Sequence, residues 1–251
     1  MASVASQVIL HPVVSQSLAM GGSTVGRDKT YRAIQYFARF YAWVLLRRGN
    51  KDDAARWSAL KSHLAIARKL MRLGKPMEHL QATMKAVMSS GTASEQATTI
   101  CRQLGYFGYL TYDAVVWANT IKFLKLSPET SAKVSRMANR FWVIGILSSI
   151  VHAVLKNARL TGEIKRLKAS KPWGEKDLGE QVERETKLAA AFSARENLKT
   201  QFYIDILDLW NPATSLGYVH FNDGVIGIFG LVSSILGFQK QWQAVQAKNK
   251  K

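Results

Sequence analysis

The 251-residue chain contains a single cysteine, Cys101, so no disulfide can form within it. This excludes a disulfide-stapled secreted module and suits a chain that folds in a reducing compartment. The first twenty residues also lack the basic segment and the long apolar segment of a secretory signal. No arginine precedes Arg27, so a mitochondrial presequence is not expected either.

Catalytic motifs are missing as well. The five histidines, at positions 11, 63, 79, 152 and 220, lie too far apart to form a metal site with one another or with the cysteine. The segment Gly21-x4-Gly26-Arg27-Asp28 only approximates a phosphate-binding loop, because it lacks the lysine and the hydroxyl that follow the second glycine. Asp205 and Asp208 fit a polar stripe on a packed helix better than a carboxylate pair. We therefore expect no enzyme activity, no cofactor and no metal.

Acidic residues are scarce: 17 aspartates and glutamates face 35 lysines and arginines, for a net charge of +18. Such a balance indicates an anionic partner, which could be nucleic acid, phospholipid or acidic protein. The charge is spread along the chain, and no basic residue interleaves with the aromatic stretch from Tyr106 to Trp117. A nucleic-acid-binding helical protein is therefore the weaker alternative. With 47% hydrophobic residues, the chain can bury a core.

Strand-like patterns and internal repeats are absent, whereas helical periodicity recurs throughout. The pattern predicts an all-α, membrane-associated helical bundle. Amphipathic helices are expected near 26–48, 53–73 and 77–88, and a longer one near 178–210. We divide the chain into an N-terminal amphipathic region (1–90), an apolar and aromatic region (91–160), a charged loop and helix (161–215) broken at Pro172 and Gly174, and a C-terminal membrane segment with a basic tail (216–251).

The stretch from Gly26 to Arg48 is the most informative of these helices. Five apolar side chains share one face: Ile34, Phe37, Tyr41, Val44 and Leu45. The opposite face carries Arg32, Gln35 and Arg39, with Lys29 and Arg47 on its flank. This pattern fits a core helix of a bundle and equally a helix that lies in the surface of an anionic membrane.

Two uncharged runs could reach into a membrane. The run 141–155 has 15 residues, and we favour a buried or re-entrant helix over a full span. The run 224–239 has 16 residues, or roughly 24 Å as a helix, and aromatic and basic residues follow it. We expect it to span the membrane, with a cytosolic C-terminus. Its small residues would allow close helix–helix contact: Gly224, Gly227, Gly230, Ser234 and Gly237.

Short motifs in a fixed order carry a resemblance to a known family. They are His11-Pro12, Gly26-Arg27-x-Lys29-x2-Arg32-x2-Gln35-Tyr36-x-Ala38-Arg39-Phe40, Arg68-Lys69-x2-Arg72-x2-Lys75-Pro76-x2-His79-Leu80-Gln81, Tyr109-x3-Asp113, Arg140-x-Trp142, Leu216-Gly217-Tyr218 and Ser233-Ser234-Ile235-Leu236-Gly237-x-Gln239-x2-Trp242. Each motif alone is weak, and all of them in order are specific. The chain resembles the peroxisomal biogenesis factor 11 family, and its fungal members in particular.

This resemblance implies a helical protein of the peroxisomal membrane, with both termini facing the cytosol. It implies that an amphipathic helix inserts into the cytosolic leaflet, elongates the membrane and promotes fission. Partners would be anionic phospholipid, further copies of the chain as a homo-oligomer, and a dynamin-related GTPase with its tail-anchored adaptor. Carried over, the head-group residues would be Arg27, Lys29, Arg32 and Arg39, helped by the basic helix 57–73, and the wedge would be the apolar face defined above.

A second hypothesis also follows from the resemblance, because some members are proposed to form pores for small metabolites. Several copies would line such a pore with the apolar segments 104–123, 141–155 and 224–238. Asp113, His152 and Asp223 would be the polar groups along it.

Overall fold

The computed structural model describes residues 4–169 and 178–249, and within them it contains nine helices and no strand. The all-helical prediction is therefore confirmed. The helices are α1 (Val4–Ile9), α2 (Pro12–Gly22), α3 (Thr24–Arg47), α4 (Lys51–Leu70), α5 (Lys75–Val87), α6 (Ala93–Thr120), α7 (Pro128–Ala169), α8 (Leu178–Ser215) and α9 (Asp223–Asn249). The expected break at Pro172 and Gly174 and the last lysines of the basic tail lie outside the described residues. Helix α7 continues through residue 160, where we expected a boundary between regions.

The turn between α3 and α4 has clear local causes. Gly49 follows the last turn of α3 with φ at +81°, a left-handed conformation that glycine adopts without steric penalty. The side chain of Asn50 then accepts a hydrogen bond from the backbone N–H of Asp53 and caps α4. These two residues turn the chain back on itself, so that α3 and α4 form an antiparallel hairpin.

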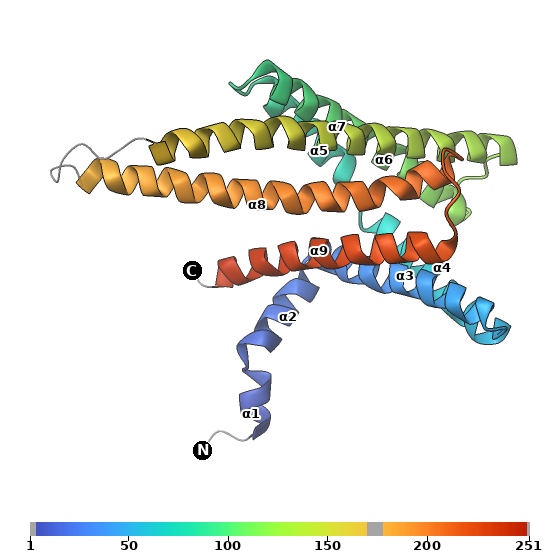
Figure 1. The fold of residues 1–251 in the computed structure, drawn as a ribbon. Coiled ribbons are helices and arrows are strands. Elements are labelled where there is room, and N and C mark those ends of the chain that lie inside the picture. Colours follow the sequence, from blue (N-terminus) through green and yellow to red (C-terminus); the bar gives the residue numbers. More distant parts are fainter. Residues whose placement is uncertain (1–3, 170–177, 250–251) are drawn as a thin grey trace.

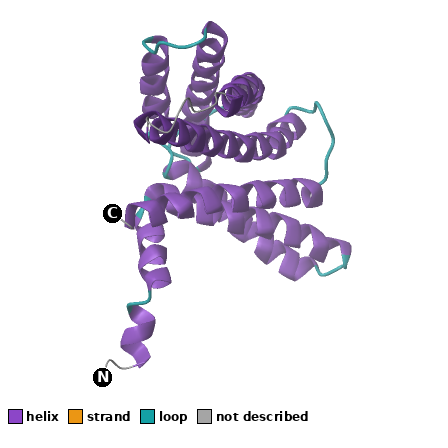
Figure 2. Cartoon of the chain, turned by 60° about the vertical axis from the view of Figure 1, so that its left-hand side comes forward, coloured by secondary structure: helices purple, strands orange, loops and turns teal. Residues whose placement is uncertain are grey.

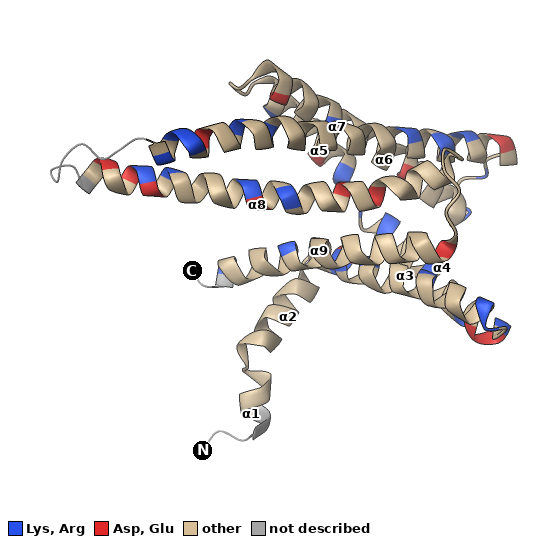
Figure 3. Ribbon diagram, in the orientation of Figure 1, with Lys and Arg blue, Asp and Glu red and all other residues tan. Residues whose placement is uncertain are grey.

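The helices form two packed groups (Figures 1 and 2). Helices α3, α4 and α9 lie together, and α9 runs along α3. Helices α5, α6 and α7 form the other group, and α8 contacts both α7 and α9 and so joins the groups. Helices α1 and α2 project from the bundle, and their described residues carry no charged side chain (Figure 3).

Glycines let the two tightest helix pairs approach. A Cβ added to Gly105 on α6 would lie 2.6 Å from the backbone nitrogen of Gly145 on α7. A Cβ added to Gly227 on α9 would lie 2.8 Å from the backbone of Phe40 on α3. Both gaps are too small for any other residue, so the absence of a side chain sets the helix separation.

The outside of the bundle is unusually apolar along α7. Ile144, Leu147, Val151 and Val154 on this helix are each at least 46% exposed. Among the helices that the structure describes, α7 is the one long and apolar enough to cross a membrane, and only 22% of its most apolar window is buried. By the same measure of length and hydropathy, α9, which we expected to span, is not a candidate. The glutamines and lysine that end its apolar run lower its mean hydropathy.

Candidate functional site

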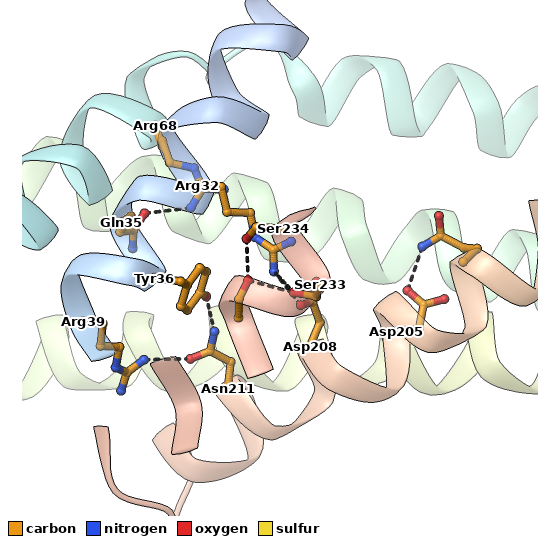
Figure 4. A network of polar contacts seen from close by, with 12 residues as sticks. Arg32, Gln35, Tyr36, Arg39, Arg68, Asp205, Asp208, Asn211, Ser233 and Ser234 are labelled. Carbon is orange, nitrogen blue, oxygen red and sulfur yellow. Dashed lines mark hydrogen bonds and ion pairs between the residues drawn. The ribbon is translucent and has the colours of Figure 1, made fainter. Parts of the chain in front are cut away.

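The charged face of α3 turns into the bundle rather than outward (Figure 4). Arg32 is 7% exposed, and its guanidinium donates to Asp208 on α8 at 2.5 Å and to Ser233 on α9 at 3.1 Å. The expectation that Arg32 faces lipid phosphates is therefore corrected. The helical wheel separated the two faces correctly, but acceptors on distant helices turn the basic face inward.

Arg39 lies on the same face of α3, about two turns further along the helix. Its Nη2 donates to Asp223 at 2.7 Å, and its Nη1 donates to the side-chain oxygen of Asn211 at 3.1 Å. The amide of Asn211 donates in turn to the hydroxyl of Tyr36, as Figure 4 shows. Arg39 is half-buried and joins α3 to the ends of α8 and α9, so it too is engaged inside the chain.

The apolar face of α3 points outward over part of its length. Ile34 and Phe37 are each 41% exposed. The rings of Phe37 and Tyr41 pack edge-on against Trp57 of α4, with centroids 5.7 and 5.0 Å apart. Leu45, by contrast, is buried, and Val44 is half-buried. Two of the five expected wedge residues thus lie on the surface beside an aromatic cluster.

Exposed basic side chains gather at the tip of the α3–α4 hairpin. Arg47, Arg48, Lys51 and Arg56 are exposed there, with Asp52 and Asp53 among them. Figure 3 shows these charges at the end of the hairpin, away from the bundle. Arg27, near the other end of α3, is exposed as well. These positions, rather than Arg32 and Arg39, can meet an anionic surface.

The basic residues at the C-terminal end of α4, and Arg72 just after it, point inward. Arg68 donates to Asp28 at 2.9 Å and to Gln35 at 2.8 Å, both on α3. Lys69 and Arg72 both pair with Asp113 on α6. The expectation that this helix adds to head-group binding is therefore corrected for these three residues, which hold α4 against its neighbours.

Together these groups line a polar cavity of about 550 Å³ inside the bundle. Asp205, which the sequence placed on a polar stripe, lies there and accepts from Ser149 at 2.5 Å and from Gln201 at 2.9 Å. Burial, with Arg32 nearby, lowers the pKa of Lys29 to about 8. Burial raises the pKa of Asp28, but Arg68 and Arg72 outweigh it and hold that pKa below its usual value. Sequence periodicity gave no sign of this cavity.

The small-residue side of α9 lies against α3 of the same chain. Gly224 faces the ring of Trp43, Gly227 faces the backbone of Phe40, and Gly230 faces the ring of Tyr36. Gly237 lies beside the aliphatic stem of Lys29, and the hydroxyl of Ser234 donates to the carbonyl of Gly230. These positions therefore make an intramolecular contact in this structure.

The three residues proposed to line a pore lie apart. Asp113 borders the cavity, where it is 6% exposed. His152 hydrogen-bonds to Thr98 and Thr99 between α7 and α6 instead. Asp223 pairs with Arg39 and Lys61 at the start of α9. Over residues 4–169 and 178–249 there is no group of histidine, cysteine or acidic side chains that could hold a metal ion.

Comparison with known proteins gives one consistent result. Residues 14–242 match the family described as peroxisomal biogenesis factor 11 (PEX11). The chain is 28% identical to peroxisomal membrane protein PMP27 of Saccharomyces cerevisiae, over 96% of this chain and 99% of that protein. It is 26% identical to PMP30A of Candida boidinii, over 97% and 100% of the two chains, and 25% identical to human peroxisomal membrane protein 11A, over 85% and 90%.

No solved structure matches the chain. The match to the family nevertheless covers nearly the whole length, and these relatives are named as proteins of the peroxisomal membrane. The resemblance inferred from ordered motifs is thereby confirmed. The chain belongs to the peroxisomal biogenesis factor 11 family and is a peroxisomal membrane protein of peroxisome biogenesis.

Proposed function

We propose that this protein elongates the peroxisomal membrane and promotes its fission by inserting the outward face of the α3–α4 hairpin into the cytosolic leaflet. The observation that carries the proposal is the orientation of α3. Arg32 is anchored inside the bundle at Asp208 and Arg39 pairs with the half-exposed Asp223, while Ile34 and Phe37 point outward, Phe37 beside Trp57. The two ion pairs fix the rotation of the helix and so present its apolar side to the lipid.

The energetics suit shallow insertion. A large apolar side chain gains about 1.5–3 kcal/mol when it leaves water completely. Ile34 and Phe37 are already partly buried, so each contributes only a fraction of this value. Exposed basic residues add roughly 1 kcal/mol each on an anionic leaflet. We therefore propose Arg27, Arg47 and Arg48 as head-group contacts, in place of Arg32 and Arg39.

The test uses the full-length protein reconstituted with anionic liposomes. Ile34→Ser together with Phe37→Ser should abolish tubulation seen by electron microscopy, without lowering the melting temperature of the protein. The matched control is Met88→Ser, since Met88 is an apolar residue that is 83% exposed at the end of α5. Tubulation that survives the double substitution, or that is lost equally in the control, contradicts the mechanism.

Self-association would concentrate such wedges into a tubule, and a dynamin-related GTPase with its tail-anchored adaptor would then complete fission. Self-association, the GTPase and the adaptor are all proposed from family membership.

We also propose that both termini face the cytosol. Because one crossing by α7 would separate the termini, this topology requires a second crossing, for which α9 is the candidate. Protease protection of tags at the two ends tests it: one protected tag and one cleaved tag would contradict it.

A metabolite channel is the second candidate, supported by the combination of apolar exterior and polar interior. Ile144 and Val151 are exposed on the outside of α7, whereas the cavity contains Asp113 and other charged groups. A charged interior within a lipid-facing bundle is a common arrangement for solute pathways. Conductance of the reconstituted protein in planar bilayers tests this; a preparation that tubulates membranes without conducting would exclude it.

A further inference from the structure

The cavity, lined by residues of helices α3 to α8, holds more basic than acidic groups. Eight basic residues line it: Lys29, Arg32, Arg39, Arg68, Lys69, Arg72, Lys75 and Arg102. Four acidic residues line it: Asp28, Asp113, Asp205 and Asp208. The lining therefore has an excess of positive charge in a partly desolvated space, where each charge interacts more strongly than in water.

The acidic residues of the cavity are already engaged. Asp208 pairs with Arg32, Asp28 pairs with Arg68, and Asp113 pairs with both Lys69 and Arg72. Asp205 accepts hydrogen bonds from two neutral side chains and has no basic group within ion-pair distance in the described part of the chain. Burial raises the pKa of Asp205 and outweighs the opposite effect of its two hydrogen bonds and of the nearby Arg102.

In the part of the chain that the structure describes, two basic side chains of the cavity lining make no ion pair, although Asp28 and Asp208 lie near Lys29 and Asp205 lies near Arg102. Within the described residues, Lys29 has neither an ion pair nor a hydrogen bond from its ammonium group. The Nε of Arg102 is buried and has no hydrogen-bond partner, although its guanidinium lies 5.8 Å from the centre of the Tyr106 ring. Lys75 and Arg39 differ, because Glu78 and Asp223 outside the cavity pair with them.

An uncompensated buried cation is costly unless an anion or an ordered acceptor meets it. Phosphate suits this lining best, because its oxygens accept charge-assisted hydrogen bonds from ammonium and guanidinium groups together. A volume of about 550 Å³ also lies within the range of small-molecule sites. We propose that this cavity binds a phosphate-bearing anion, contacted by Lys29 and Arg102, either as a free phosphorylated molecule or as a phospholipid head group.

The test uses the full-length protein in dodecyl maltoside micelles, which contain no phosphate. One arm adds inorganic pyrophosphate at constant ionic strength, with chloride as the reference. The other arm adds short-chain phosphatidic acid, with short-chain diacylglycerol as the reference. We expect at least one phosphate ligand to raise the melting temperature. Stabilisation by pyrophosphate indicates a free ligand, whereas stabilisation by phosphatidic acid alone indicates a lipid head group.

The decisive variant is Lys29→Gln combined with Arg102→Gln, which should weaken binding at least about 10-fold. Without ligand it should melt no lower than wild type, because it removes unneutralised charge. Lys133→Gln with Arg136→Gln, at exposed positions near the start of α7 that do not line the cavity, is the matched control and should bind like wild type. No stabilisation in either arm, or equal binding by the decisive and control variants, overturns the proposal. Should the double variant not fold, Lys29→Gln alone is compared with Lys133→Gln, and unchanged affinity of Lys29→Gln overturns the proposal.

Discussion

Arg32 on α3 and Asp208 on α8 form a buried ion pair at 2.5 Å, with side chains 8% and 14% exposed. The two residues are 176 positions apart in the sequence. The pair, together with Ser233, ties α3 to both α8 and α9. It thereby determines which side of α3 faces the interior of the bundle and which side faces outward.

Breaking this pair from one side should destabilise the protein strongly. Arg32→Gln leaves the carboxylate of Asp208 buried without a cation, which costs about 3–5 kcal/mol in other proteins. We expect a marked fall in melting temperature in detergent, followed by tryptophan fluorescence. Arg56→Gln is the control, because Arg56 is 81% exposed in its pair with Asp53 and should change stability by at most about 1 kcal/mol. Equal melting of both variants would contradict a structural role for Arg32.

The contact between α3 and α9 should tolerate no side chain at Gly227. Its missing Cβ would lie 2.8 Å from the backbone of Phe40, and backbone cannot move aside as a flexible side chain can. Gly227→Ala should therefore destabilise the protein by about 1–3 kcal/mol. Gly162→Ala on α7, where nothing lies within 4 Å, should be neutral or stabilise by up to about 1 kcal/mol. Thermal melts of the two variants measure whether each one is less or more stable than wild type. A Gly227→Ala variant as stable as wild type would contradict this packing.

Helix α7 should fail to insert when a charge is placed on its exposed face. Leu147 is 46% exposed within the apolar run. A central arginine costs about 2.5–3.5 kcal/mol on insertion. Leu147→Arg should increase the fraction released from membranes by alkaline carbonate. Val182→Arg on α8 is the control, because Val182 is 61% exposed outside α7 and should remain in the membrane pellet. Full retention of Leu147→Arg would argue against α7 as a span.

Lys29 should make stability depend on pH in the alkaline range. Burial and Arg32 lower its pKa from 10.5 to about 8 in the folded protein. Between these values the unfolded chain keeps a proton that the folded protein has lost, so this residue makes stability rise with pH. Below pH 8 both states are protonated, and the full penalty of burying the charge remains.

Lys29→Met should therefore be more stable than wild type at pH 7, with a difference that shrinks from pH 8 to pH 10. Melting temperatures in phosphate-free detergent buffers measure this difference. Lys51→Met is the control at an exposed position, and its melting temperature should differ from that of wild type by the same amount at every pH. A difference for Lys29→Met that does not change with pH would contradict the lowered pKa.

Much of the local structure follows from the sequence. The amphipathic helices α3, α4 and α5 lie close to their expected ranges, and Gly49 follows the end of α3 with φ at +81°. Local signals suffice here, because caps, glycines and a period of 3.6 residues act within one or two turns. The family could also be recognised from the sequence, since its motifs occur in order along the chain.

The sequence by itself determined which side chains share a helix face, and with them the helical class and the family. Only the tertiary structure decided which face points inward. A helical wheel cannot distinguish an arginine that meets a lipid phosphate from one that meets an aspartate on another helix. For Arg32 that acceptor is Asp208, and for Arg68 it is Asp28. The sequence alone could not reveal the unpaired cations in the cavity either, because charge compensation depends on contacts between helices far apart in the sequence.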